Sequence, residues 1–511
     1  MDDSRNKQLS VNLIAIIVQV ALNYAISFFL TPYIVNNVGS EAHGFITLGN
    51  NLINYITIFT TALNSVVGRY VTISIHKGNK KQANEYFNSV LWANVLLAII
   101  IVAGSAFVIN YLEYFFTVPS YLVRDVKILF SLIVFNFVIT IICNVFTIAT
   151  FITNKLYISN IGNSIGICIK VIVLLILYGN YNATIIFVGV ASLLNTFFVS
   201  IYNIVVNKKL NIGINIRLWS FSFAKIKELF FSGIWNSVTK LSQVLTDGLD
   251  MIMSNLFINV QAMGCLSVAY TVPSMIANVI GSITNIFAPQ QTYYYAKEDT
   301  SEVVGQIKLN MKIMGFFVNI ILVGFIIYGK EFFILWTPTQ DIQLIYELAV
   351  ISCCSMVITG VTSALNNVFL LTNHLKENSM VCILIGVFDC AVAFLLVRYT
   401  GAGVYAIAGV SKIVGAIVNI TYIPLFASKC LNVSYKTFYP VICKYIFSTL
   451  VLLIVMGILH LVLCFMPISW VSLIVKIIIN GGIVSIINYH ILLNKNERVY
   501  LKNIVLKKLK L

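Results

Sequence analysis

The sequence is a succession of apolar stretches, each long enough to cross a lipid bilayer as an α-helix, which takes about 20 residues. Hydrophobic side chains make up 59% of the 511 residues and charged side chains only 10%, a balance at which a soluble domain would aggregate. We therefore predict an all-α integral membrane protein with about 14 transmembrane helices. The predicted spans lie at residues 11–36, 43–70, 87–112, 120–150, 156–180, 182–207, 229–258, 261–289, 309–330, 341–372, 378–400, 402–427, 441–465 and 468–492. The fourth and tenth are long enough to be kinked or tilted.

The basic residues predict the orientation of the chain. An even number of spans puts both termini on one side, and 24 of the 33 Lys and Arg residues then lie in or beside the segments on that side. Four lie in or beside the loops of the other side, at Arg124, Lys127, Lys330 and Arg398. Because short basic loops stay in the cytoplasm, we predict cytoplasmic N- and C-termini. The formal charge of +15 is thereby explained by membrane orientation, and no nucleic-acid partner is expected.

A weak internal repeat at an offset of 220 residues predicts two similar lobes. Residues 41–44 (EAHG), which open the second span, correspond to residues 261–264 (QAMG), which open the eighth, and Asn23 corresponds to Gln243. Such repeats are typical of transporters. We predict an N-terminal lobe of spans 1–6 (1–207), an interfacial linker (208–228), a C-terminal lobe of spans 7–12 (229–427), spans 13 and 14 (428–493), and a basic cytoplasmic tail (494–511).

The sequence contains no pattern typical of an enzyme. Its five histidines are scattered, and its ten cysteines lack the spacing of metal ligands or of a disulfide framework. No outer loop is long enough to house an active site. We therefore predict a protein that is not an enzyme and binds no metal centre and no cofactor, with a coupling H⁺ or Na⁺ as the one small ion to consider.

The seventh predicted span carries three ionisable residues: Lys240, Asp247 and Asp250. On one continuous helix, Lys240 and Asp247 share a face, and Asp250 lies one turn beyond Asp247. Each charge costs about 2.5–3.5 kcal/mol at the centre of a membrane helix, so this stripe should face protein or a watery cavity. The spacing leaves two interpretations open: a functional polar interior, or a Lys–Asp pair that only joins two helices.

Other predicted spans also carry charged residues, namely Lys170, Asp389, Lys412 and Lys476. Lysines from several spans that lined one cavity would attract a phosphate or pyrophosphate, because an ammonium group in low dielectric gains more from an anion than one at the surface. The acids have two possible roles, which are neutralising the lysines in an empty cavity or taking up H⁺ or Na⁺. The predicted substrate-cavity residues are Lys240, Lys412, Lys170, Arg69, Asn23 and Gln243, and those for ion coupling or charge balance are Asp247, Asp250 and Asp389.

The chain resembles the polysaccharide flippases of the Wzx type, in the superfamily that also holds lipid II flippases and multidrug and toxin extrusion exporters. The resemblance lies in the span layout and in residues 30–32 (LTP), residues 38–45 (VGSEAHGF), Arg69, and residues 77–79 (KGN) with the helix from 83 to 88. It implies two six-helix lobes facing each other as a V, two further C-terminal helices, and a central cavity open alternately to each side. The implied cargo is an oligosaccharide on a polyprenyl pyrophosphate carrier, moved across the bacterial cytoplasmic membrane. A polysaccharide polymerase and chain-length machinery are the implied partners of a monomeric protein.

Two other classes of function compete with this one. A drug exporter of the same fold, driven by H⁺ or Na⁺, would depend on the acids, whereas a net positive cavity argues against cationic drugs. A membrane-bound polymerase or ligase should have a sizeable outer loop with clustered Arg, His or acidic residues, and the sequence has no such loop.

Overall fold

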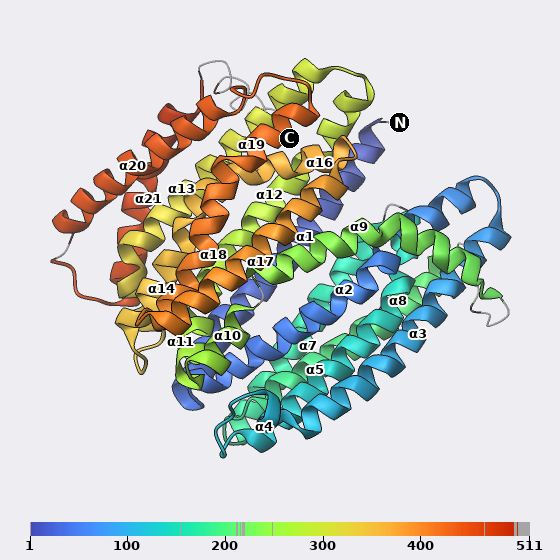
Figure 1. Ribbon diagram of the computed structural model, residues 1–511, viewed down its shortest axis with the longest axis horizontal. Coiled ribbons are helices and arrows are strands. Elements are labelled where there is room, and N and C mark those ends of the chain that lie inside the picture. Colours follow the sequence, from blue (N-terminus) through green and yellow to red (C-terminus); the bar gives the residue numbers. More distant parts are fainter. Residues whose placement is uncertain are drawn as a thin grey trace. The chain divides into compact units, whose positions relative to one another are not determined.

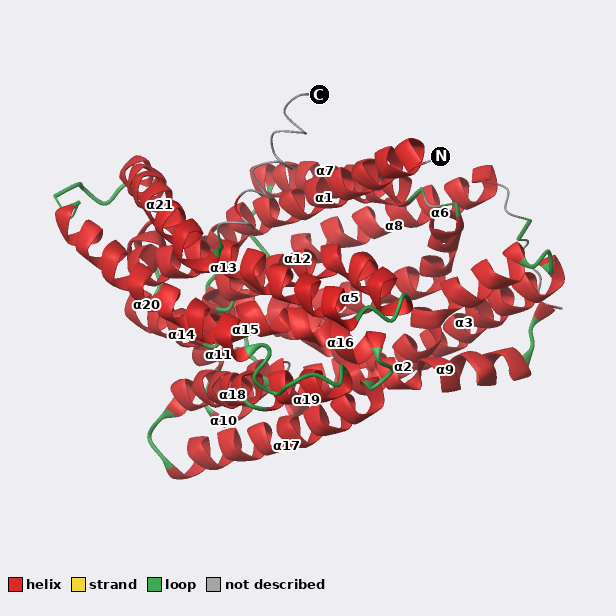
Figure 2. Ribbon diagram, turned by 90° about the horizontal axis from the view of Figure 1, so that it is seen from above, coloured by secondary structure: helices red, strands yellow, loops and turns green. Residues whose placement is uncertain are grey.

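The computed structural model describes residues 2–498 except 154, 211, 212, 215, 217–219, 248, 464 and 495–497, so the predicted tail lies almost wholly outside the described residues. The described chain is helical, with short turns and no strand, as predicted (Figures 1 and 2). The helices are α1 (Asp2–Asn37), α2 (Ser40–His76), α3 (Lys80–Asn110), α4 (Leu112–Phe115), α5 (Val123–Asn144), η1 (Val145–Thr147), α6 (Ile148–Ile152), α7 (Leu156–Asn180), α8 (Ile186–Leu210), α9 (Phe223–Asp247), α10 (Asp250–Phe257), α11 (Val260–Ala269), α12 (Thr271–Ala296), α13 (Thr300–Trp336), α14 (Ile342–Cys354), α15 (Met356–Thr362), η3 (Ser363–Leu365), α16 (Asn366–Leu371), α17 (Leu375–Tyr399), α18 (Gly403–Ile420), α19 (Tyr422–Cys430), α20 (Tyr439–Val462) and α21 (Trp470–Leu492).

Among the described residues, eleven helical segments are long and apolar enough to cross a membrane. A twelfth is added if α11 and α12, which meet at a 41° bend, form one broken span. The polar helices α2 and α9 are not among them, and the predicted count of 14 is not confirmed. The protein is nevertheless a multi-pass membrane protein.

Several predicted spans are interrupted. The long fourth and tenth spans were expected to be kinked or tilted, and in each the α-helix is interrupted by a short 3₁₀ segment, η1 in the fourth and η3 in the tenth. The seventh was predicted as one helix, and this is wrong, because α9 ends at Asp247 and α10 begins at Asp250. Asp250 thus lies in the first turn of a new helix, where the helix dipole favours a carboxylate. Lys240 and Asp250 therefore do not share one continuous helical stripe.

The helices form two compact units. Unit 1 consists of Met1–Ser267 with Ser379–Cys390, and unit 2 of Val268–Asn378 with Ala391–Leu511. Unit 1 therefore includes α9, α10 and part of α17, although these residues belong to the predicted C-terminal lobe. Lobes that move during transport need not coincide with units of dense packing, so the predicted lobe boundaries stay a prediction.

The internal repeat is visible in the helix boundaries. Four pairs of helix ends each lie 220 positions apart, namely Asn37 and Phe257, Ser40 and Val260, His76 and Ala296, and Lys80 and Thr300. The starts of α3 and α13 are also capped alike, because the Asn79 side chain accepts from the backbone N–H of Gln82 and the Asp299 side chain from that of Glu302. The repeat predicted from residues 41–44 and 261–264 is therefore confirmed as a structural repeat.

The two repeat-related tetrapeptides pack against each other within unit 1. A Cβ added at Gly44 would lie 3.2 Å from Cα of Gly264, and one added at Gly264 would lie 2.6 Å from the carbonyl carbon of Ser40. The start of α2 and the start of α11 therefore approach so closely that a side chain at Gly264 would force the backbone apart, and one at Gly44 would be tightly packed. His43, which is next to Gly44, fastens the crossing, because its Nδ1 lies 2.8 Å from the Ser267 hydroxyl.

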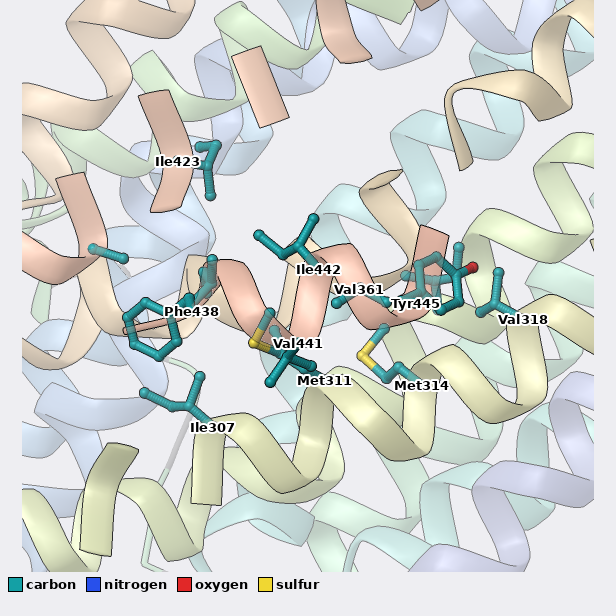
Figure 3. Packing of buried hydrophobic residues seen from close by; sticks show 14 of the residues in the cluster. Ile307, Met311, Met314, Val318, Val361, Ile423, Phe438, Val441, Ile442 and Tyr445 are labelled. Atoms are coloured by element: carbon teal, nitrogen blue, oxygen red, sulfur yellow. The ribbon is translucent and has the colours of Figure 1, made fainter. Parts of the chain in front are cut away.

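The core of unit 2 forms around α13. Met311, Met314 and Val318 of α13 pack against side chains of α15 and α20, including Val361 and Tyr445 (Figure 3). These positions recur at helical spacing along one face of α13, which is how an apolar helix buries a continuous stripe. The aromatic rings and thioethers fill the space left by small neighbours and exclude water from the centre of the unit.

Polar contacts join α20 and α21 to α13. The Lys476 side chain, only 1% exposed, donates to both carboxylate oxygens of Glu331 at 3.0 and 2.9 Å. Deeper in the unit, the Thr449 hydroxyl of α20 donates to Asn319 of α13 at 2.6 Å, and the Asn488 amide of α21 donates to the carbonyl of Phe316 of α13 at 2.9 Å. Lys476, one of the intramembrane charges noted in the sequence, therefore has a carboxylate partner and holds the last helix in place.

Candidate functional site

The helix that carries Lys240 is held against α2 by a very close contact. A Cβ added at Gly233 of α9 would overlap the carbonyl oxygen of Ala62 in α2. One turn further on, the Ser237 hydroxyl donates to the carbonyl of Ile58 at 2.6 Å. On another face of α9, the hydroxyls of Thr239 and Ser379 lie 2.6 Å apart, which links α9 to α17. These contacts on two sides fix the rotation of α9.

The contact at Gly233 gives a stability prediction. Gly233→Ala should lower the free energy of unfolding by about 1–3 kcal/mol, because the new methyl group must displace backbone rather than a flexible side chain. The matched control is Gly68→Ala on α2, where the added Cβ would make an ordinary 3.7 Å contact with Phe151. Thermal unfolding in detergent compares the two variants. Equal melting temperatures for both would show that the α2–α9 contact is looser than described.

With α9 held in this way, Lys240 is half-buried and Gln243, one turn further along, is exposed. The other predicted cavity residues of unit 1 lie on different helices: Lys170 is half-buried on α7, and Arg69 on α2 and Asn23 on α1 are exposed. Asn23 donates to the carbonyl of Gln19 within α1 at 3.3 Å. The described contacts do not join these five side chains into one cluster.

The acids, by contrast, come together in unit 1. Asp250 of α10 is 7% exposed and Asp389 of α17 is 4% exposed, and both interact electrostatically with the thiol of Cys390. The Tyr55 hydroxyl, from α2, interacts with Asp250 and with Cys390. The Cys390 thiol also donates to the carbonyl of Leu245 at 3.3 Å, so the last turns of α9 and the middle of α17 face each other. Asp250 and Asp389 thus share one buried polar region.

This acidic region includes two residues that sequence reasoning did not select. Tyr55 lies in the second predicted span, whose polar asparagines were the one signal that this helix faces a polar interior. Cys390 is adjacent to Asp389, but a lone cysteine carries no signal of its own. The side chain of Asp247 lies outside the described residues. Within the described chain, no group of three or more His, Cys, Asp or Glu side chains is placed to bind a metal ion.

Lys412 lies in unit 2, on α18. Its Nζ lies 5.6 Å from the centre of the Tyr270 ring, a cation–π contact, and Cys353 of α14 is within electrostatic range. Tyr270 occupies the break between α11 and α12. Aromatic rings attract an ammonium group without neutralising its charge, so the contact with Tyr270 helps to position Lys412. The contact between Tyr270 and Lys412 could not be predicted from the sequence, because the position of the Tyr270 ring depends on where the helix breaks between α11 and α12.

These features define a class of protein: a multi-pass helical membrane protein with charged groups buried between its helices. A family model described as "Polysaccharide biosynthesis protein" matches residues 9–289, more than half of the chain, and the chain belongs to this family. The uncharacterized membrane protein EpsK of Bacillus subtilis (strain 168) is 27% identical over 427 residues, which are 83% of this chain and 83% of EpsK. The resemblance to polysaccharide flippases drawn from the sequence is thereby confirmed.

Solved structures show the fold. An inward-facing multidrug resistance MATE family transporter of the MOP superfamily matches with a TM-score of 0.65 and 16% identity, over 81% of this chain and 96% of the transporter. The lipid II flippase MurJ in an inward closed conformation matches with a TM-score of 0.64 and 15% identity, over 94% of this chain and 98% of MurJ. The predicted MATE-like fold is therefore confirmed, and these two solved structures are of a transporter and a flippase.

Proposed function

We propose that this protein is a flippase that moves polyprenyl-pyrophosphate-linked oligosaccharide units from the cytoplasmic to the outer leaflet for surface polysaccharide assembly. Membership of the polysaccharide biosynthesis family supports the class of cargo, and the MATE-like fold supports transport by alternating access. The observation that carries the proposal is the set of half-buried lysines on helices of both units, Lys170 and Lys240 in unit 1 and Lys412 in unit 2.

The lysines would act on the pyrophosphate group. An ammonium group that is partly withdrawn from water has lost much of its hydration, so it binds a doubly charged anion more strongly than a surface lysine does. Lys240 and Lys412 are the main candidates because packing fixes the helix of the first and a cation–π contact holds the second. Arg69, Lys170, Asn23 and Gln243 complete the proposed cavity, and the amides suit the hydroxyl groups of sugars.

The buried acids would either neutralise the charge of the lysines or take up a coupling ion. With the cavity empty, carboxylates near the lysines lower the cost of keeping cations inside the membrane. During transport, Asp250 and Asp389 would take up H⁺ or Na⁺, and Asp247 is proposed to share this role. A carboxylate pair in one buried region can bind a proton readily, because two like charges at close range disfavour double ionisation.

The proposal includes an orientation and a location. The excess of basic residues on one side supports cytoplasmic termini in the cytoplasmic membrane of a bacterium. The two lobes of 1–207 and 229–427 are proposed to rock against each other. Spans 13 and 14 (428–493) belong to neither lobe. A monomer working beside a polysaccharide polymerase and chain-length machinery is the proposed assembly.

A reconstitution experiment tests the proposed activity. Purified protein is placed in liposomes that contain a fluorescent polyprenyl-pyrophosphate oligosaccharide, and a membrane-impermeant reagent destroys the label in the outer leaflet. Liposomes with active protein should lose nearly all of the signal, whereas protein-free liposomes should lose about half. A loss of only half in the presence of folded protein would count against the flippase.

The second candidate function is an H⁺- or Na⁺-driven exporter of small molecules, which the shared burial of Asp250 and Asp389 favours. For such an exporter, Asp250→Asn should increase the sensitivity of cells to its drug substrates. The flippase proposal expects unchanged drug sensitivity in the same variant, together with altered polysaccharide export. A drug-susceptibility panel on the Asp250→Asn strain therefore separates the two functions.

A further inference from the structure

Six exposed lysines gather at one end of unit 1. They come from three segments: the turn before α3 and its first residues, the end of α8, and the first turns of α9 (Figures 1 and 2). We call this set the lysine collar, and it consists of Lys77, Lys80, Lys81, Lys208, Lys209 and Lys227. Neither the proposed cargo cavity nor the acidic region uses any of these residues.

Hydrogen bonds fasten the three segments of the collar together. The Asn84 side chain of α3 donates to the carbonyl of Gly213, beyond the end of α8, at 3.1 Å. The backbone N–H of Ser222, just before α9, donates to the hydroxyl of Ser89 in α3 at 2.9 Å. These hydrogen bonds fix the three segments relative to one another, so the collar is a defined surface of the folded unit.

Glu228, the acidic residue at the start of α9, is already paired within the unit. Glu228 accepts from the Tyr86 hydroxyl at 2.9 Å and from Lys225 at 3.1 Å, and the Lys225 ammonium lies 4.7 Å from the centre of the Tyr86 ring. This internal pairing removes Lys225 and Glu228 from the charge that the surface presents. In the described residues of the three segments, Glu85 is the remaining carboxylate, against six exposed lysines.

Exposed phenylalanines lie beside the collar. Phe223 and Phe231 of α9 are 72% and 65% exposed, and Phe221 and Phe230 are also exposed. Large apolar rings next to flexible lysines are typical of a surface at the boundary between lipid headgroups and acyl chains, where the rings enter the apolar layer and the ammonium groups reach phosphates. A soluble polyanion would leave these four rings in water, so the rings favour a lipid surface over such a partner.

We propose that the lysine collar binds the phosphate headgroups of anionic phospholipids. The charge of the collar is complementary to such lipids, and its phenylalanines supply the apolar contact that a free phosphate cannot use. The lipids would anchor the start of α9, and through its contacts with α2 they would hold the helix that carries Lys240. This inference does not depend on which cargo the protein transports.

The test compares lipid preference in two triple variants. One removes three collar charges (Lys80→Gln, Lys81→Gln, Lys208→Gln), and the control removes three exposed lysines of unit 2 (Lys376→Gln, Lys429→Gln, Lys436→Gln). Each protein is titrated with fluorescent phosphatidylglycerol in nanodiscs of phosphatidylcholine. The collar variant should bind phosphatidylglycerol at least tenfold more weakly than wild type, since each basic residue at an anionic surface contributes about fivefold. The control variant should bind as wild type does, and added salt should narrow the difference.

Three outcomes would overturn the proposal. Wild-type binding by the collar variant would show that the collar is not the site, and equal weakening of the control variant would show that only net charge matters. The third concerns Phe223→Ser with Phe231→Ser, which should also weaken the binding of phosphatidylglycerol. If this phenylalanine variant binds phosphatidylglycerol as tightly as wild type does, and inorganic pyrophosphate displaces the lipid from both, the collar is a simple anion site.

Discussion

Lys240→Ala and Lys412→Ala are each expected to abolish the export of surface polysaccharide while the protein stays folded in the membrane. The reason is electrostatic: a half-buried ammonium group offers the pyrophosphate an attraction that alanine cannot replace. Both side chains are only half-buried, and alanine is the residue that a helix accommodates best, so folding should survive. Surface polysaccharide is measured by immunoblot, and membrane levels of the protein by a terminal tag.

Two controls make this prediction specific. Lys429→Ala removes an exposed lysine from the end of α19 and should leave export unchanged. Lys240→Arg keeps the positive charge and should retain a substantial part of the activity, although a guanidinium group differs in shape. Full polysaccharide production by both alanine variants would contradict the proposed role of the lysines, whatever the cargo.

Glu331→Gln is expected to cause the largest loss of stability. Lys476 is 1% exposed and donates hydrogen bonds to both oxygens of the Glu331 carboxylate, so the substitution leaves its ammonium group inside unit 2 without a counter-charge. Breaking a buried ion pair by removing one partner typically costs about 3–5 kcal/mol. Thermal unfolding in detergent should show a large decrease in melting temperature and a loss of protein from the membrane.

The double variant Glu331→Gln with Lys476→Met provides the control. It removes both charges and fills the space with an unbranched apolar side chain. Replacing both partners of a buried ion pair by uncharged residues often leaves stability unchanged. The double variant should therefore recover most of the stability that Glu331→Gln loses. If both variants are equally unstable, packing and not charge pairing holds α21 to α13.

The sequence predicted the repetitive parts of the fold well. A likeness of four residues at an offset of 220 was enough to predict a repeat, and the helix ends at Asn37 and Phe257 follow it. The length of the fourth and tenth spans predicted that they are kinked or tilted, and a short 3₁₀ segment interrupts the α-helix in each. The break between Asp247 and Asp250 was missed, because the apolar run continues through it and hydropathy does not show where one helix ends and the next begins.

The pairing of side chains could not be predicted from the sequence. Lys476 and Glu331 are 145 positions apart, and Glu331 lies near the end of its helix, where a carboxylate usually meets water. Asp250 and Asp389 were each selected as intramembrane acids, but only the packing of α17 beside the end of α9 and the start of α10 brings them together. The same holds for Lys412 and Tyr270, whose contact depends on the bend between α11 and α12.

The most direct test of the proposed function is the leaflet distribution of lipid-linked oligosaccharide in cells that lack this protein. If the protein is the flippase, the deletion strain should accumulate lipid-linked oligosaccharide in the cytoplasmic leaflet, where a membrane-impermeant probe reaches it only in inverted vesicles. Re-expression of the wild-type chain should remove this pool, and Lys240→Ala should not. An unchanged distribution between the leaflets after deletion would contradict the proposed function.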